Sequence, residues 1–243
     1  MDNRPLVAFH TLGCKLNQAE TEHLALQFAE AGYVIATEDN ADVCILNTCT
    51  VTHIADRKSR HMLRLLRKRN PNAFIVATGC YAEREQQKLM QTGIDLTVGN
   101  NQKMDLLKLI EHHPAGNQSC SNRTSTDDYS ARVRSFIKIQ DGCNDFCSYC
   151  IVPLVRGGEF CLPADEIISQ INSRVAAGYK EVILTGTKIG TTNIMESTFR
   201  ILSTLFLKRP IYKDCTFLHC NRRRYPKNCS VYGRIRVFAD TFT

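Results

Sequence analysis

Short apolar runs alternate with longer segments of helical character along the first 112 residues. The apolar runs cover residues 6–12, 42–49, 73–80 and 94–99. The segments after them have the length and periodicity of helices, and they end near Gly32, Arg69, Gly93 and His112. Four strand–helix alternations predict a parallel sheet covered by helices on both faces, which is an α/β fold.

The first predicted helix also carries a typical start signal. Asn17 is followed three residues later by Glu20, which is the spacing of a capping box, and Gly32 is a suitable stop. We therefore expect Asn17 to cap this helix.

The pattern changes after residue 113. Residues 114–131 are dominated by Pro, Gly, Ser, Thr, Asn and Asp without an apolar period, as in an interdomain linker. An alternating strand-like segment then leads to residue 143, a helix is expected from about Pro163 to Gly178, and residues 181–186 form another apolar run. A second β/α domain is therefore expected over residues 132–195.

Three cysteines, Cys14, Cys49 and Cys80, stand at the ends of the first three predicted strands. Open parallel sheets bind ligands just beyond the carboxyl ends of their strands, so these thiols should meet at one edge although they are 35 and 31 positions apart. Chance burial is the alternative, and it is the preferred interpretation for Cys44 inside the second strand.

The remaining composition limits the classes of protein. Twelve cysteines without a basic and apolar leader favour reduced thiols over a disulfide framework. No run of about 18 apolar residues predicts a membrane span, so we expect a cytoplasmic protein without a membrane partner. The net charge of +7 arises within residues 196–243, and the first 195 residues are balanced. Global charge therefore does not indicate what the main body binds.

A second set of cysteines, Cys143, Cys147 and Cys150, lies in the segment "DGCNDFCSYC". Thiolates this close on one loop suit the corners of a [4Fe–4S] cluster, in which three ligands leave one iron open. Structural zinc normally takes four ligands, and the nearest further candidate is Cys161. Zinc remains the alternative.

The spacing Cys143-x3-Cys147-x2-Cys150, with Tyr149 before the last cysteine, resembles the signature of radical S-adenosylmethionine enzymes. The resemblance implies that the open iron binds S-adenosylmethionine and that its reductive cleavage yields a 5′-deoxyadenosyl radical. It places Tyr149 near the adenine. Residues Gly157, Gly158 and Glu159 resemble the glycine-rich segment that binds the methionine amino group, with an ordinary loop as the alternative.

The segments "TLGCKLNQAE", "LNTCTVT" and "ATGCYAER" resemble the N-terminal domain of methylthiotransferases, and "AGYKEVILTG" resembles their barrel. The resemblance covers residues 5–190. It implies a methylthiotransferase domain over residues 1–113, the start of a radical S-adenosylmethionine partial (β/α) barrel over residues 132–195, and a second [4Fe–4S] cluster on Cys14, Cys49 and Cys80.

"LGCKLN" and "NTCTVT" most resemble the branch that acts on tRNA N6-threonylcarbamoyladenosine. This branch transfers a methylthio group to C2 of that nucleoside, next to the anticodon, and requires a one-electron reductant such as flavodoxin or ferredoxin. Branches acting on isopentenyladenosine in tRNA or on a ribosomal protein remain alternatives. A noncatalytic iron–sulfur protein for electron transfer or cluster storage is the alternative from another class.

The helix predicted from about Ile54 to Arg69 carries a basic run over residues 56–69, and its buried side is expected to hold Met62, Leu63, Leu65 and Leu66. Arg64, Arg67 and Lys68 are candidates for contact with tRNA phosphates. A solvated charged face is the alternative interpretation.

The resemblance stops near residue 190. The family continues through further β/α units and an RNA-binding TRAM domain, whereas residues 196–243 show no clear helical or strand repeat. Cys215, Cys220, Cys229 and His219 fit no common zinc spacing. We expect an atypical tail, with a shift of the reading frame as one explanation, and an incomplete copy of the enzyme.

Overall fold

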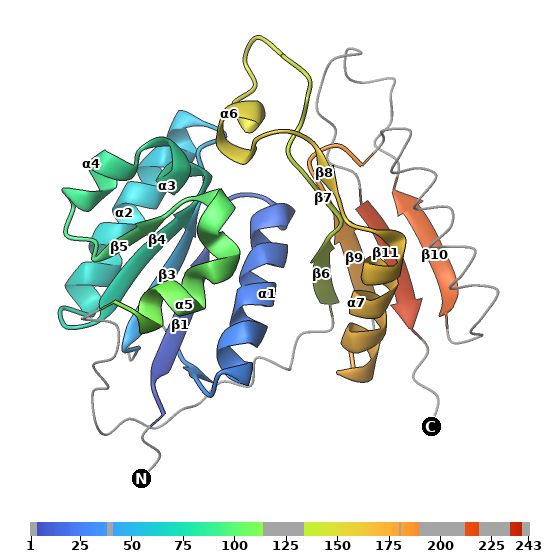
Figure 1. Ribbon diagram of the computed structural model, residues 1–243, viewed down its shortest axis with the longest axis horizontal. Helices are drawn as coiled ribbons and strands as arrows, with labels where there is room; N and C mark the ends of the chain where they lie inside the picture. The colour runs from blue at the N-terminus through green and yellow to red at the C-terminus, as the bar shows by residue number, and fades with distance from the viewer. Residues whose placement is uncertain are drawn as a thin grey trace. The chain divides into compact units, whose positions relative to one another are not determined.

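The computed structural model describes residues 4–37, 41–113, 134–179 and 181–189, together with the strand paths of β10 (Tyr212–Leu218) and β11 (Arg234–Ala239). The chain forms two compact units (Figure 1). The first comprises Met1–Ser130 and Leu154–Arg156, and the second comprises Ala131–Pro153 and Gly157–Thr243. The predicted linker lies outside the described residues.

The first unit contains a parallel five-stranded sheet in the order β2-β1-β3-β4-β5. Its strands are β1 (Leu6–Thr11), β2 (Val34–Ile35), β3 (Val43–Thr48), β4 (Phe74–Gly79) and β5 (Leu96–Val98). Its helices are α1 (Lys15–Glu30), α2 (His53–Arg69), α3 (Cys80–Arg84), α4 (Gln86–Met90), the 3₁₀ helix η2 (Asn100–Asp105) and α5 (Leu106–Glu111). The predicted parallel sheet is confirmed, and β2 is an edge strand that the sequence pattern missed.

Side chains that alternate along the strands build a core on each face of this sheet. Val43 and Ile45 of β3 pack with residues of α1 and α5, whereas Cys44 and Leu46 pack with Leu63 of α2 and residues of α3 and α4. Figure 1 shows α1 and α5 on one face and α2 and α4 on the other. Burial on both faces explains why the strands are continuous apolar runs, and it confirms Cys44 as a core residue.

Two helix boundaries differ from the sequence pattern. Helix α1 begins at Lys15 with Cys14 as its N-cap residue and no side-chain cap, so the prediction that Asn17 caps it is wrong. The single helix expected before Gly93 is interrupted at Glu85, between α3 and α4. Helix α2 has a side-chain cap, because Thr52 accepts a hydrogen bond from the Ala55 N–H at 3.1 Å.

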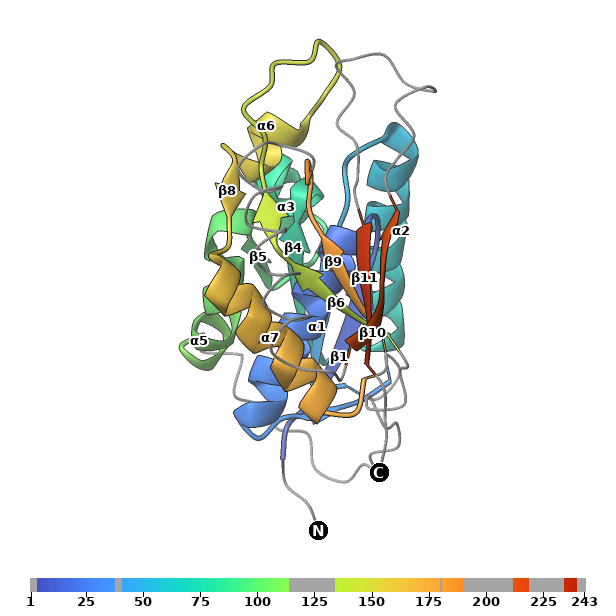
Figure 2. The same cartoon turned by 90° about the vertical axis from the view of Figure 1, so that its right-hand side faces the viewer.

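The second unit begins with a parallel β/α/β arrangement. Strands β6 (Arg134–Lys138) and β9 (Glu181–Thr185) pair in parallel and are connected through α7 (Ala164–Ala176). Ile167 and Ile171 of α7 pack on Ile137, Val182 and Leu184 of the strands. Figure 2 shows α7 against this part of the sheet.

A small ladder supports the loop with the second cysteine set. Strand β7 (Gln140–Asp141) pairs antiparallel with β8 (Phe160–Cys161), and the short helix α6 (Val152–Arg156) precedes β8. The ladder therefore brings the chain back beside the start of the loop that holds Cys143, Cys147 and Cys150.

Beyond β9 the structure differs from the sequence pattern, which predicted no strand. Strand β11 pairs antiparallel with β9, and β10 pairs antiparallel with β11, in a four-stranded sheet ordered β10-β11-β9-β6. The far edge of β9 is therefore paired with β11. Short strands separated by long connections leave little periodicity for sequence reasoning to detect.

Within the described ranges, none of the helices combines the length and the apolar character needed to cross a membrane.

Candidate functional site

Three neighbouring strands of the first unit bring Cys14, Cys49 and Cys80 to one end of the sheet. Cys14 follows β1 by three residues, Cys49 directly follows β3, and Cys80 directly follows β4. The strands are adjacent in the order β1-β3-β4 and run parallel, so their carboxyl ends meet at one edge. Burial raises the pKa of the Cys49 thiol, and the charges of Cys80 and Cys14 raise it further.

Two glycines with left-handed backbones make this close approach possible. Gly13 has φ +100°, and a Cβ atom there would lie 2.6 Å from both Sγ and Cβ of Cys49. Gly79 has φ +97°, and a Cβ atom there would lie 2.4 Å from Oδ1 of Asn47 and from the Thr48 carbonyl oxygen. Any larger residue would therefore push the cysteine-bearing turns apart.

Asn17 holds two of these turns together. Its side chain is fully buried, and its Nδ2 donates to the carbonyl oxygens of Leu12 at 2.8 Å and Thr48 at 3.0 Å. These carbonyls lie two residues before Cys14 and one residue before Cys49. Asn17 thus acts between two strand ends instead of at the start of a helix.

The backbone around Cys49 is fixed by hydroxyl groups. Ser59 Oγ accepts a hydrogen bond from the Cys49 N–H at 3.3 Å and donates to the Cys49 carbonyl at 3.1 Å. Thr48 Oγ1 donates to the Thr78 carbonyl at 2.6 Å and accepts from the Ala82 N–H at 3.0 Å. The hydrogen bond from Ala82 connects the end of β3 to α3, the helix that begins at Cys80.

Amide side chains lie beside two of the sulfurs. Asn17 Oδ1 lies 3.8 Å from Cys14 Sγ, and Asn100 Nδ2 lies 3.8 Å from Cys80 Sγ. Asn100 Oδ1 is buried and has no hydrogen-bond partner in the part of the chain that is described. A buried amide oxygen without a partner calls for an explanation, and a group bound near Cys80 would supply one.

No group of three or more His, Cys, Asp and Glu side chains within the described residues could hold a single metal ion. An iron–sulfur cluster requires a different arrangement of thiolates from a single metal ion, because each thiolate binds a separate iron atom of the cluster. Three thiols, a cradle closed by glycine and adjacent amide groups fit such a cluster.

The second unit carries Cys143, Cys147 and Cys150 on the loop after β7. Cys143 is buried, while Cys147 and Cys150 are partly exposed. The Cys143 N–H donates to the Gly157 carbonyl at 3.1 Å, and the Cys150 N–H donates to the Cys147 carbonyl at 3.0 Å. The loop is thus anchored at its first cysteine and makes a turn between the other two.

The glycine-rich segment packs directly on the start of this loop. Gly142 has φ +68°, and a Cβ atom there would lie 2.0 Å from the Gly158 carbonyl oxygen and 2.8 Å from that of Gly157. The Glu159 N–H donates to Oδ1 of Asn144 at 3.0 Å. The structure therefore brings Gly157, Gly158 and Glu159 beside the loop on which Cys143 begins the cysteine motif.

Gln140 connects the cysteine loop with the turn after β9. The side chain is 1% exposed, and Nε2 donates to the carbonyls of Asp141 and Gly142 at 3.0 and 2.9 Å. Its Oε1 accepts from the Lys188 N–H at 2.7 Å. Lys188 Nζ also pairs with Asp145 of the loop at 2.5 Å, and this hydrogen bond raises the pKa of Lys188.

The aromatic residues of the loop face solvent in this structure. Phe146 is 95% exposed and Tyr149 is 79% exposed. Exposed aromatic side chains around partly exposed thiols leave surface for a bound molecule to cover.

Cys161, the nearest further candidate for a zinc ligand, lies on β8 and not on the loop of the Cys143 set. It pairs across the β7–β8 ladder with Gln140 and packs against the core beneath α7. Its thiol therefore contributes to the apolar packing of the second unit. Zinc at the Cys143 set stays an alternative prediction. Of the tail residues considered for zinc, Cys215 lies on β10, and none of their side chains is described.

The three basic candidates for RNA contact on helix α2 differ in exposure and in their hydrogen-bond partners. Arg64 and Lys68 are exposed. Arg67 Nε donates to the Gly93 carbonyl, its Nη1 donates to the carbonyls of Pro71 and Ala73, and its Nη2 pairs with Asp95. The guanidinium of Arg67 thus joins the C-terminal end of α2 to neighbouring turns.

Comparisons with known proteins agree with this arrangement. Residues 6–99 match the family described as Uncharacterized protein family UPF0004. The chain is 41% identical over 196 residues to the threonylcarbamoyladenosine tRNA methylthiotransferase MtaB of Aquifex aeolicus, which covers 75% of this chain and 48% of the relative. The chain belongs to the methylthiotransferase family. The family that the cysteine segments indicate is thereby confirmed.

Two further relatives bear on the branch. The methylthiotransferase MtaB of Bacillus subtilis is 39% identical over 197 residues, covering 76% of this chain and 44% of the relative. The tRNA-2-methylthio-N(6)-dimethylallyladenosine synthase of Bacteroides thetaiotaomicron is 31% identical over 225 residues, covering 86% and 49%. The identities to the two enzymes named for threonylcarbamoyladenosine are higher than the identity to the dimethylallyladenosine enzyme. The chain spans about half the length of the curated relatives it matches.

Several supporting residues gave no usable signal in the sequence. Asn100, Gln140 and Lys188 are polar residues in or near turns, where such residues are common for many reasons. Asn17 did give a signal, but its spacing to Glu20 indicated a cap. Only the sheet order reveals that Asn17 reaches the neighbouring strand.

Proposed function

We propose that this chain carries the two cofactor sites of a tRNA methylthiotransferase that acts on C2 of N6-threonylcarbamoyladenosine next to the anticodon. The proposed cofactors are two [4Fe–4S] clusters and S-adenosylmethionine. The proposed partners are tRNA and a one-electron reductant such as flavodoxin or ferredoxin, and the proposed compartment is the cytoplasm.

One observation carries the proposal. Cys14, Cys49 and Cys80 meet at the carboxyl end of one sheet, with Cys49 packed against Gly13, in a chain 41% identical to a named enzyme of this kind. The second set, Cys143, Cys147 and Cys150, lies on a separate loop packed against Gly157 and Gly158. Two separate sets suit a reaction that needs a radical and a sulfur atom.

The residues of the chain have distinct roles in this proposal. When bound, the cluster at Cys143, Cys147 and Cys150 would supply an electron to S-adenosylmethionine, and the cluster at Cys14, Cys49 and Cys80 would supply sulfur. Gly157, Gly158 and Glu159 would bind the amino group of the cofactor, and Tyr149 would cover its adenine. A radical route suits an unactivated C2–H bond, and an anticodon-loop base can be splayed into a pocket.

Anaerobic reconstitution with iron and sulfide tests the cofactor part of the proposal. We expect about eight iron atoms per chain, because each three-cysteine set suits a cluster of four. The Cys147→Ala variant should lose about half of that iron, and so should the Cys14→Ala/Cys80→Ala variant. If the latter retains all of the iron, the cluster at the strand ends is wrong.

Cleavage of S-adenosylmethionine separates the enzyme from a noncatalytic iron–sulfur protein. With a chemical reductant, the reconstituted chain should release 5′-deoxyadenosine, and Cys147→Ala should release none. Iron bound without any cleavage would favour electron transfer or cluster storage. Mass spectrometry of nucleosides from tRNA bearing either threonylcarbamoyladenosine or isopentenyladenosine would then distinguish the branches.

A further inference from the structure

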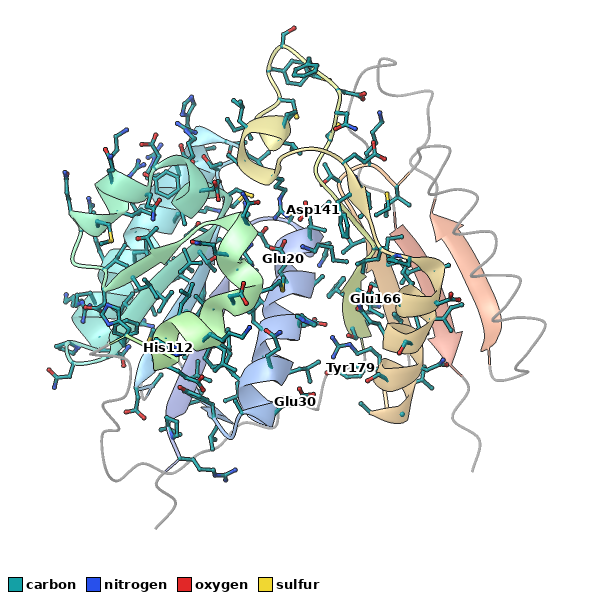
Figure 3. All side chains as sticks on the ribbon, viewed as in Figure 1. Glu20, Glu30, His112, Asp141, Glu166 and Tyr179 are labelled. Atoms are coloured by element: carbon teal, nitrogen blue, oxygen red, sulfur yellow. The ribbon has the colours of Figure 1, made fainter. Side chains whose placement is uncertain are left out.

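A buried ion pair lies beneath the three-cysteine site of the first unit. Lys103 of η2 is 1% exposed and Glu20 of α1 is 2% exposed, and Lys103 Nζ lies 2.5 Å from Glu20 Oε2. Figure 3 labels Glu20 on α1. Burying two charges costs free energy that a pair of packed apolar residues would not cost. A stability role alone is therefore a poor explanation for this pair.

Lys103 is connected to the cysteine turns through the amide of Asn47. Its Nζ donates to Oδ1 of Asn47 at 3.4 Å, and the same oxygen packs against Gly79, the residue before Cys80. Asn47 Nδ2 donates to the Asn17 carbonyl at 3.0 Å, and Asn17 holds the turns of Cys14 and Cys49. The ammonium thus lies directly behind the backbone that presents the thiols.

A second cation contacts the same carboxylate. Arg156, which belongs to the first unit, donates to the second oxygen of Glu20 at 2.9 Å, so two cations share one carboxylate. Burial and the charge of Arg156 lower the pKa of Lys103, while the Glu20 carboxylate and the charge of Cys80 oppose that shift. Lys103 thus brings a buried ammonium close to Cys80, where anionic ligands would collect further negative charge.

We propose that Lys103 is a positioning residue that places a positive charge behind the three-cysteine site and makes a cluster bound there easier to reduce. The inference rests on the proposed cluster at Cys14, Cys49 and Cys80. Reduction adds negative charge to a cluster, so a fixed cation in a buried site stabilises the reduced state and raises the midpoint potential.

The test measures that potential in the full chain with only one cluster. The background variant is Cys143→Ala/Cys147→Ala/Cys150→Ala, reconstituted anaerobically and titrated by electron paramagnetic resonance. Lys103→Met and Lys103→Gln should make one-electron reduction on the order of tenfold less favourable, which corresponds to about 59 mV more negative. Lys103→Arg retains the charge and should keep the background potential.

A matched control and an independent variant remove ambiguity. Lys108→Met deletes an exposed lysine of α5 that pairs with Asp105 three residues away, and it should leave the potential unchanged. Asn47→Asp keeps Lys103 but places a carboxylate against its ammonium. This variant should also lower the potential, and it decides the matter if the Lys103 variants do not bind iron.

Each outcome has a definite meaning. An unchanged potential in Lys103→Met with full iron content overturns the inference, and so does an equal fall in Lys103→Arg, which would indicate packing instead of charge. If Asn47→Asp must decide, an unchanged potential there overturns it. A background variant that binds no iron overturns the proposed cluster itself. Measuring the iron content before the titration therefore distinguishes a failure of the proposed cluster from a failure of the role inferred for Lys103.

Discussion

At the scale of single residues, two glycines of the first unit have similar backbones and different surroundings. Gly13 and Gly32 have φ +100° and +92°. A Cβ atom on Gly13 would meet Cys49 Sγ at 2.6 Å, whereas a Cβ atom on Gly32 would meet nothing within 4 Å. Alanine substitutions at the two positions therefore distinguish the cost of backbone strain from the cost of steric overlap with Cys49, a proposed cluster ligand.

We predict that Gly13→Ala lowers the free energy of unfolding by at least about 2 kcal/mol, because strain and steric overlap add. Its reconstituted form should lose about half of the iron, since Cys49 is displaced from its cluster. Gly32→Ala is the matched control and should cost about 1 kcal/mol with full iron content. Chemical denaturation and iron analysis measure both effects. Equal iron content in the two variants would contradict the prediction.

Gln140 allows a similar test in the second unit. Gln140→Ala removes an amide that satisfies two carbonyls and one N–H in a buried position, so it should destabilise this unit by about 1–3 kcal/mol. Cleavage within residues 141–150 should become faster in limited proteolysis. Gln170→Ala, which deletes a partly exposed glutamine of α7 that bonds Glu166 one turn away, is the control and should change neither measurement. An unaltered cleavage rate in Gln140→Ala would contradict a clamping role.

At the scale of elements, α2 has a buried apolar face and an exposed basic face. Leu63 and Leu66 are buried against the sheet, and basic residues lie on the exposed side of the helix. The guanidinium of Arg67 donates hydrogen bonds to Gly93, Pro71 and Ala73 and pairs with Asp95, so its charge supports the fold. The prediction that Arg64, Arg67 and Lys68 contact RNA stays a prediction, and the structure makes Arg64 and Lys68 the better pair for testing it.

We predict that Arg64→Gln/Lys68→Gln weakens tRNA binding and reduces the salt slope of the logarithm of affinity by about two, one for each lost phosphate contact. Lys108→Gln is the control and should leave affinity and slope unchanged. Arg67→Gln should instead lower the melting temperature, because four hydrogen-bonded groups lose their partner. Filter binding at several salt concentrations gives the slopes. An unchanged slope in the double variant would show that the basic face of α2 is an ordinary solvated face without RNA contact.

At the scale of the whole molecule, the chain consists of two units with separate cores. The first has a complete parallel sheet with helices on both faces. The second joins one parallel β/α/β arrangement to antiparallel strands β11 and β10. The two units should therefore differ in stability.

Limited proteolysis of the intact chain should leave a resistant fragment that ends within residues 114–131, where the composition predicts a linker. The antiparallel pairing of β11 with β9 predicts a second, shorter-lived fragment that extends from the linker through residue 239. Mass spectrometry of the fragments over time identifies both. Early cleavage between residues 41 and 113 would contradict the expected stability of the first unit.

Much of this protein was determined by the sequence alone. Periodicity predicted the strands that end near Cys14, Cys49 and Cys80, because each residue's face in a strand or helix follows from local spacing. Close spacing identified Cys143, Cys147 and Cys150, because all three lie on one loop. The parallel order of the first sheet followed from the alternation of strands and helices.

Only the tertiary structure decided which polar residues support these sites. Lys103 and Glu20 are 83 positions apart, and Asn17 reaches Thr48 across 31 positions. Gln140 reaches Lys188 across 48. Such contacts depend on the order and register of strands, which local periodicity does not encode. For the same reason, the spacing of Asn17 and Glu20 suggested a helix cap, whereas the folded chain uses both side chains beneath the thiols.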